Sequence, residues 1–148
     1  LKRIRSNGNR DTTYYAYKTY YYSRTKHLAN PKWPANLQDL KQALYRRFKS
    51  RVNSLLINIY RNGHHSLGWH CDDQKELGEN PTIFSISMGE TRSFAMKNKF
   101  NGNISSLELC SDSLLIMAGR TQANWLHSIS PVAEGTGCRV NLTFRYIL

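Results

Sequence analysis

The chain has 148 residues, 40% of them hydrophobic, and a formal net charge of +11 at pH 7, so it is long enough for one domain with a substantial core. No apolar run is long enough to span a bilayer and no signal peptide opens the sequence, which argues against a membrane protein or a secreted protein. The three cysteines match no zinc-finger spacing, and their odd number favours a reduced, intracellular protein in which they act as small packing residues.

The basic excess lies in the N-terminal third of the chain. Residues 1–52 contain 13 of the 21 Lys and Arg residues and 2 of the 10 Asp and Glu residues, whereas residues 53–148 carry no net charge. A concentrated basic segment favours a polyanionic partner, most commonly nucleic acid. Composition alone also allows a solvated basic tail.

The first 25 residues divide into a polar part and a tyrosine-rich part. We predict no regular structure for residues 1–12. Residues 13–25 contain six tyrosines interleaved with Lys18 and Arg24, which indicates a strand or hairpin. Such a segment can stack on bases while its cations contact phosphates, but an ordinary strand with one aromatic face in the core has the same pattern. The candidate phosphate contacts are Arg10, Lys18, Arg24 and Lys26.

A helix follows this segment. Asn36 is a residue type that favours the N-cap, and apolar residues recur after it at helical spacing. We therefore predict an amphipathic helix over residues 37–51 whose apolar face covers a sheet. The recurring residues are Leu37, Leu40, Ala43, Leu44 and Phe48.

From Ser54 onward the pattern changes to short strands separated by turns, among them Gly89-Glu90 and Asn101-Gly102. Eight short strands without intervening helices are typical of a sandwich, jelly roll or barrel. The predicted strands are 54–60, 66–72, 82–88, 91–97, 104–109, 113–118, 124–129 and 139–147.

A histidine and a carboxylate share one face of the second of these strands. His70 and Asp72 are two residues apart, so their side chains point to one side and Cys71 points to the other. They would be two ligands of the 2-His-1-carboxylate triad that holds Fe(II), although His-x-Asp also arises by chance as a hydrogen-bonded surface pair. His127 lies between apolar residues of a later strand and is the candidate third ligand.

The last predicted strand places two arginines on one face, Arg139 and Arg145, with Asn141 between them. Two arginines on an interior face require anions, which predicts a dicarboxylate site, whereas an edge strand would expose the same face to solvent. Asn58 and Tyr60, two apart on another strand, offer further donors.

Taken in chain order, these elements resemble the AlkB family of Fe(II)/2-oxoglutarate-dependent dioxygenases, and within it homologues 2 and 3. The likeness runs from about residue 55 to the end of the chain and is weaker in the first 50 residues. The motifs that carry it are Asn58-x-Tyr60, His70-x-Asp72-Asp73, His127 and Arg139-x-Asn141-x-Thr143-Phe144-Arg145.

The resemblance implies a mainly β fold, a double-stranded β-helix (a jelly-roll barrel of about eight strands) with the N-terminal helix packed on it. It implies that His70, Asp72 and His127 ligate Fe(II) and leave open positions for 2-oxoglutarate and O2. The residues implied to bind 2-oxoglutarate are Arg139, Tyr60 and Asn58 at its distal carboxylate, Arg145 near its C1 carboxylate, and Asn141 in support.

The implied reaction is oxidative demethylation of 1-methyladenine or 3-methylcytosine in nucleic acid, which repairs the base and yields formaldehyde, succinate and CO2. The damaged base is extruded into the pocket, where Asp73 contacts its exocyclic amine and Tyr22, or else Tyr20, contributes an aromatic lid. We place Trp69 in the core, because alternation points it away from the iron. The apolar residues expected to line the cavity are Leu55, Ile57, Ile59, Leu115 and Met117.

Two alternatives remain open: an oxygenase of this type acting on RNA or protein, and a catalytically degenerate barrel that binds nucleic acid. The basic, tyrosine-rich N-terminus favours nucleic acid, and the complete ligand set argues against the degenerate barrel. We predict a single domain, 1–148, with a lid over residues 1–35, a helix in 36–52 and a catalytic barrel over 53–148. We expect it to act as a monomer inside the cell, in the nucleus of a eukaryote or otherwise in the cytoplasm.

Overall fold

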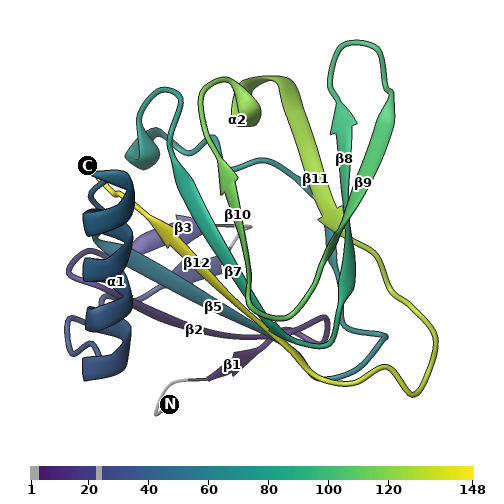
Figure 1. The fold of residues 1–148 in the computed structure, drawn as a ribbon, viewed down its shortest axis with the longest axis horizontal. Helices are drawn as coiled ribbons and strands as arrows, with labels where there is room; N and C mark the ends of the chain where they lie inside the picture. The colour runs from purple at the N-terminus through teal and green to yellow at the C-terminus, as the bar shows by residue number, and fades with distance from the viewer. Residues whose placement is uncertain (1–3, 23–24) are drawn as a thin grey trace.

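The computed structural model describes residues 4–22 and 25–148, and its regular structure is mainly β (Figure 1). A six-stranded antiparallel sheet contains, in spatial order, β1 (Arg5–Ser6), β2 (Asp11–Ala16), β5 (Ser54–Tyr60), β12 (Arg139–Arg145), β7 (Ile83–Gly89) and β10 (Ser113–Met117). A four-stranded antiparallel sheet contains β6 (Leu67–His70), β11 (Trp125–Ile129), β8 (Arg92–Asn98) and β9 (Ile104–Leu109). The remaining elements are the hairpin of β3 (Tyr20–Tyr22) and β4 (Thr25–His27), the helices α1 (Ala35–Phe48) and α2 (Thr121–Asn124), and the 3-10 turn η1 (Lys75–Leu77).

The eight strands predicted after residue 53 are confirmed as β5 to β12. Two of them, β5 and β9, match the predicted ranges in full, and the others differ by one or two residues at an end. The two sheets lie face to face as open layers, which is the jelly-roll arrangement that the strand pattern predicted. The side chains buried between them are Tyr60, Ile83, Phe94, Leu109, Met117 and Ile129.

Helix α1 lies on the other side of the six-stranded sheet, as its apolar pattern predicted (Figure 1). Leu44 is buried there against the outward side chains of β5 and β12, including Leu55 and Phe144. The predicted N-cap was wrong, because the helix begins at residue 35 and Pro34 occupies the cap position with an extended backbone. Proline is tolerated there because it lacks only an N–H that the helix does not use, while its carbonyl oxygen accepts from the N–H groups of Leu37 and Gln38.

The prediction that Leu55, Ile57 and Ile59 line the cavity was wrong. These three side chains belong to the core beneath α1. Alternation requires this result: Asn58 and Tyr60 point between the sheets, so the odd-numbered residues of β5 must point outward. Met117 does lie between the sheets, as predicted.

The N-terminal segment is more ordered than we predicted. Residues 1–12 were expected to lack regular structure, but β1 and the first two residues of β2 lie within that range. Strand β2 pairs with β5 along its whole length, so the ladder hydrogen bonds of a neighbouring strand order a segment whose own composition is polar. Its tyrosines alternate: Tyr15 packs against Trp33 on the helix side, and Tyr14 packs with Tyr20 on the opposite side.

Two further placements differ from the sequence analysis. Trp69, which we predicted to be in the core, is 44% exposed because β6 is an edge strand with no layer over its outer face. All three cysteines are free, and Cys110 and Cys138 are exposed rather than packed. No helix within the described residues is long and apolar enough to cross a membrane.

His27 in β4 provides a test of how tightly the tyrosine-rich hairpin packs. Burial, reinforced by the nearby Arg145 guanidinium, lowers the pKa of His27 from 6.5 to about 4. The unfolded chain therefore binds a proton below pH 6.5 that the folded chain does not bind until about pH 4. The free energy of unfolding should fall as the pH falls through this window, by at most about 1.4 kcal/mol per pH unit for one group.

Chemical denaturation of the metal-free protein between pH 4 and pH 7 measures this slope. His27→Gln should make the dependence shallower, while His64→Gln, which changes an exposed histidine, should leave it unchanged. Equal slopes in all three proteins would contradict a buried, neutral His27.

Candidate metal and co-substrate site

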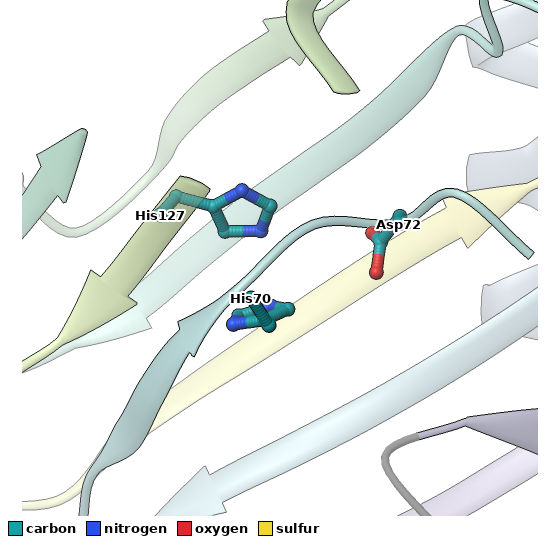
Figure 2. A group of neighbouring side chains, drawn as sticks. All are labelled: His70, Asp72 and His127. Carbon is teal, nitrogen blue, oxygen red and sulfur yellow. The ribbon is translucent and has the colours of Figure 1, made fainter. Parts of the chain in front are cut away.

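The three predicted metal ligands converge between the two sheets (Figure 2). His70 ends β6 and His127 is at the centre of β11, and the two residues are direct cross-strand partners. Their ring centroids are 4.1 Å apart, and one ligand atom from each of His70, Asp72 and His127 lies within 4.8 Å of the others. Two imidazoles and one carboxylate in this arrangement form a 2-His-1-carboxylate site for a metal ion such as Fe(II).

Asp72 reaches this group from a loop rather than from a strand. The predicted strand extended to residue 72, but β6 ends at residue 70. The Asp72 backbone N–H donates instead to Oε1 of Gln122, at 2.8 Å, so the chain leaves the ladder and is held by α2. Gln122 is buried, and the sequence offered no signal for its role beyond being polar.

Both histidines are neutral at physiological pH, as metal ligands must be. Burial lowers the pKa of His127 to about 3, with the adjacent His70 as the second cause. Burial also lowers the pKa of His70. The His70 Nδ1–H donates to the Gly68 carbonyl oxygen at 2.8 Å, which leaves the lone pair on Nε2 for a metal ion.

Asp72 is held as a carboxylate by a buried ion pair. The Nε and Nη2 atoms of Arg145 lie 3.1 and 2.8 Å from Oδ2 of Asp72, and both side chains are almost completely buried. Burial by itself would raise the pKa of Asp72, but the Arg145 guanidinium outweighs it and holds that pKa below its usual value.

The unpaired atoms of this group fit a metal ion. Oδ1 of Asp72 and Nδ1 of His127 are buried and have no hydrogen-bond partner within the described parts of the chain. Buried polar atoms are rarely left unpaired without a reason, and Arg145 occupies Oδ2 while leaving Oδ1 open. A divalent cation between the three side chains would satisfy Oδ1 of Asp72.

A second group of side chains, on the six-stranded sheet, fits an anion. Arg139 is 2% exposed and pairs directly with Tyr60 across β12 and β5. Its Nη2 donates to Ser87 at 2.9 Å, while Nε and Nη1 have no partner among the described residues. Burial lowers the pKa of Arg139, and no acidic side chain among the described residues forms an ion pair with it. A carboxylate is the ligand that a guanidinium binds through two parallel hydrogen bonds.

Asn58 and Asn141 form a polar network beside Arg139. They are direct cross-strand partners, and Asn58 Nδ2 lies 3.4 Å from Asn141 Oδ1. Asn141 also donates to Ser85 at 2.7 Å. The Asn58 oxygen accepts from Nε of Arg10 at 2.8 Å. Arg10 is 5% exposed, so our prediction that it contacts a phosphate was wrong: it is built into this network.

The metal and anion groups line one cavity between the sheets. Both imidazoles and both predicted co-substrate arginines face it, and Tyr22 lies at its edge with its ring 5.8 Å from that of His70. The free volume is about 30 Å³, which is space for about two water molecules. A dicarboxylate would therefore enter only if side chains such as Tyr22 move outward.

The other residues that we predicted to contact the substrate do not lie together in the structure. Tyr20 is buried behind Tyr22, with the two rings stacked at 6.2 Å, and does not line the cavity. Asp73 follows Asp72 and is exposed. Lys18 and Lys26 are exposed, and Arg24 lies outside the described residues.

The fold and the triad define a metal-dependent oxygenase class, and comparison with known proteins agrees. The profile of the 2OG-Fe(II) oxygenase superfamily matches residues 3–145. The chain therefore belongs to this superfamily. Membership implies Fe(II), 2-oxoglutarate and O2 as cofactors, as the sequence analysis predicted.

Individual relatives confirm the predicted resemblance to the AlkB family. The chain is 40% identical to human alpha-ketoglutarate-dependent dioxygenase alkB homolog 3 over 145 residues, covering 92% of this chain and 51% of that protein. It is 36% identical to DNA oxidative demethylase ALKBH2 of Arabidopsis thaliana over 136 residues, covering 76% of this chain and 43% of that protein. The chain thus spans about half the length of these relatives. The structure of OsALKBH1 matches it with a TM-score of 0.69 and 19% identity, over 97% of this chain and 83% of that one, which supports the fold.

Substituting Asp72 tests both the metal site and the ion pair. Asp72→Ala should abolish binding of Co(II) or Mn(II) and lower the free energy of unfolding by about 3–5 kcal/mol, because Arg145 would be left buried and unpaired. Asp72→Asn should lose less stability, since its amide oxygen can still accept from Arg145. Metal titration and urea denaturation provide the two measurements.

Asp73→Ala is the matched control, since it removes the adjacent, exposed carboxylate and should change neither quantity. Metal binding retained in Asp72→Ala would remove Asp72 from the proposed ligands.

Proposed function

We propose that this chain is a nucleic-acid demethylase that uses Fe(II) and 2-oxoglutarate to remove methyl groups from the nitrogen atoms of bases. The observation that carries the proposal is the juxtaposition, in one cavity, of the His70, Asp72 and His127 triad with the unpaired guanidinium of Arg139. Bound Fe(II), with 2-oxoglutarate and O2, supplies the chemistry that hydroxylates an N-methyl group while the co-substrate becomes succinate and CO2. The hydroxymethyl group then leaves as formaldehyde and the base is restored.

Different side chains bind the metal, bind 2-oxoglutarate and exclude water, according to where they lie in the cavity. The triad holds the metal on the four-stranded sheet, while Arg139 and Tyr60 bind the distal carboxylate of 2-oxoglutarate on the six-stranded sheet. Arg145 keeps Asp72 ionised and adjoins the triad, where it would also meet the C1 carboxylate of 2-oxoglutarate. The Asn58 and Asn141 amides keep the floor of the cavity polar and fixed. The surrounding apolar side chains exclude water from the reacting atoms.

Three features support nucleic acid as the substrate. The relatives include one named DNA oxidative demethylase. The basic excess of the chain lies within residues 1–52, a range that also supplies Tyr22 to the cavity lining. Asp73, exposed next to a ligand, offers a carboxylate to the exocyclic amine of 1-methyladenine or 3-methylcytosine, whose methylated rings are cationic.

The proposed organisation has a lid over residues 1–35, a supporting helix in 36–52 and a catalytic barrel over 53–148. The triad and both arginines come from one chain, so we propose that the unit acts as a monomer. A nucleic-acid substrate places its work inside the cell, in the nucleus of a eukaryote or otherwise in the cytoplasm.

The direct test is mass spectrometry of an oligonucleotide carrying one 1-methyladenine, incubated with the protein, Fe(II), 2-oxoglutarate and O2. Loss of the methyl group that requires 2-oxoglutarate supports the proposal. Succinate formation without demethylation would point to another substrate, such as a methylated RNA or protein. Absence of both products from iron-loaded protein would favour a barrel that binds without catalysis.

Arg139→Met should raise the KM for 2-oxoglutarate by roughly 30-fold or more, because a buried charged hydrogen-bonding partner of the carboxylate is lost. The KM for the oligonucleotide should change little. Steady-state kinetics with each substrate varied in turn measures both constants.

Lys26→Met is the reciprocal control, since it removes an exposed cation of the β3–β4 hairpin. It should raise the oligonucleotide KM and reduce its salt dependence without affecting 2-oxoglutarate. The opposite pattern for the two variants would reverse these assignments.

A further inference from the structure

Arg92, in β8, is a buried cation that the proposed reaction does not use. It is 1% exposed and is among the largest fully buried side chains. No acidic side chain pairs with it among the described residues. Its guanidinium donates instead to backbone carbonyl oxygens: Nη2 lies 2.9 Å from that of His65 and 2.5 Å from that of Ser130, and Nη1 lies 3.5 Å from that of Asn62.

These carbonyls belong to two loops that connect the two sheets. Asn62 and His65 lie between β5 and β6, and Ser130 begins the segment between β11 and β12. Each loop joins a strand bearing a metal ligand to a strand bearing a proposed 2-oxoglutarate contact. The guanidinium of Arg92 therefore links the two loops that join the strands bearing metal ligands to the strands bearing the proposed 2-oxoglutarate contacts.

The two loops also touch directly, backbone against backbone. The Val132 N–H donates to the Gly63 carbonyl oxygen at 2.9 Å. A Cβ atom on Gly63 would lie 2.2 Å from the carbonyl oxygen of Ala133, so only glycine allows this approach. Because the two backbones are in direct contact here, a displacement of one loop would also displace the other.

Arg92 also reaches the proposed anion site through an aromatic ring. Its guanidinium carbon lies 5.7 Å from the centre of the Tyr60 ring, and that of Arg139 lies 5.2 Å from the same centre. Tyr60 is thus a shared neighbour of both cations and is fully buried. Arg92 does not line the cavity, so its effect on a bound carboxylate must pass through Tyr60 and the two loops.

We propose that Arg92 is a positioning residue for 2-oxoglutarate, an inference that rests on the proposed function of Arg139 and Tyr60. It fixes the ring of Tyr60, the loop that leaves β5 and the start of the segment that leads from β11 to β12, and so holds the Arg139 guanidinium in place opposite the triad. The metal ligands depend on it less, because His70 and His127 are held as direct partners in one ladder and Asp72 is held by Arg145 and Gln122.

Arg92→Lys tests this role, since an ammonium group keeps the charge but cannot donate in a planar fork to both loops. Binding is measured by calorimetry, first of Mn(II) to the metal-free protein and then of 2-oxoglutarate to the Mn(II)-loaded protein. We expect 2-oxoglutarate binding to weaken at least tenfold while Mn(II) binding changes less than twofold. Hydrogen exchange at the Val132 amide should accelerate, because its partner loop is no longer tied. Arg120→Lys, at an exposed arginine, should change none of these values.

If Arg92→Lys does not fold, Gly63→Ala tests the same contact between the two loops. It should likewise weaken 2-oxoglutarate binding while changing Mn(II) binding little. Equal losses of metal and 2-oxoglutarate affinity would indicate a general structural role and overturn the inference. Unchanged 2-oxoglutarate binding in Arg92→Lys, with clear loss in Arg139→Met, would overturn it while leaving the proposed function intact. If Arg139→Met also binds 2-oxoglutarate normally, the proposed anion site itself is wrong.

Discussion

The ion pair between Asp72 and Arg145 is the contact on which the arrangement of the cavity depends. It joins a loop that follows the four-stranded sheet to the last strand of the six-stranded sheet, and both side chains are buried. Burying two charges is costly unless each is fully paired, so the geometry of the pair is tightly constrained. Because Arg145 occupies one carboxylate oxygen, the other oxygen is directed to the histidines. A single interaction thus sets the charge of the metal site, the orientation of its carboxylate and the spacing of the two sheets.

The metal-ligand histidines and the proposed anion-binding residues are held in place by different pairs of strands. The histidines are neighbours in one ladder, where backbone hydrogen bonds fix their separation. Arg139 and Tyr60 are neighbours in another ladder, on the opposite sheet. Between the halves there is little free space, so a dicarboxylate must displace side chains on entry. The loops that connect the sheets, rather than the strands themselves, therefore determine how the anion site faces the metal.

Much of the fold and the site could be predicted from alternation along the strands. The pattern placed the two arginines of β12 with Asn141 on one face, and in the structure that face lines the cavity. The prediction that Leu55 and Ile57 line the cavity was inconsistent with the same rule, because alternation places them on the face opposite to Asn58 and Tyr60. The placement of Trp69 in the core was also wrong, because Trp69 points to the outer face of the four-stranded sheet, where it is exposed. The strand structure within residues 5–12 was missed because pairing with distant residues supplies the hydrogen bonds: β2 pairs with β5, and β1 pairs in turn with β2.

The sequence by itself determined the strand periods, the helix and the residue types of the triad, because these depend on local spacing, and its motifs carried the resemblance to the family. The tertiary structure decided which faces meet and which residues act together. Asp72 and Arg145 are far apart along the chain, and Arg92 contacts two loops that no short motif connects. Such contacts arise from the packing of one sheet on another, so local spacing leaves them undetermined.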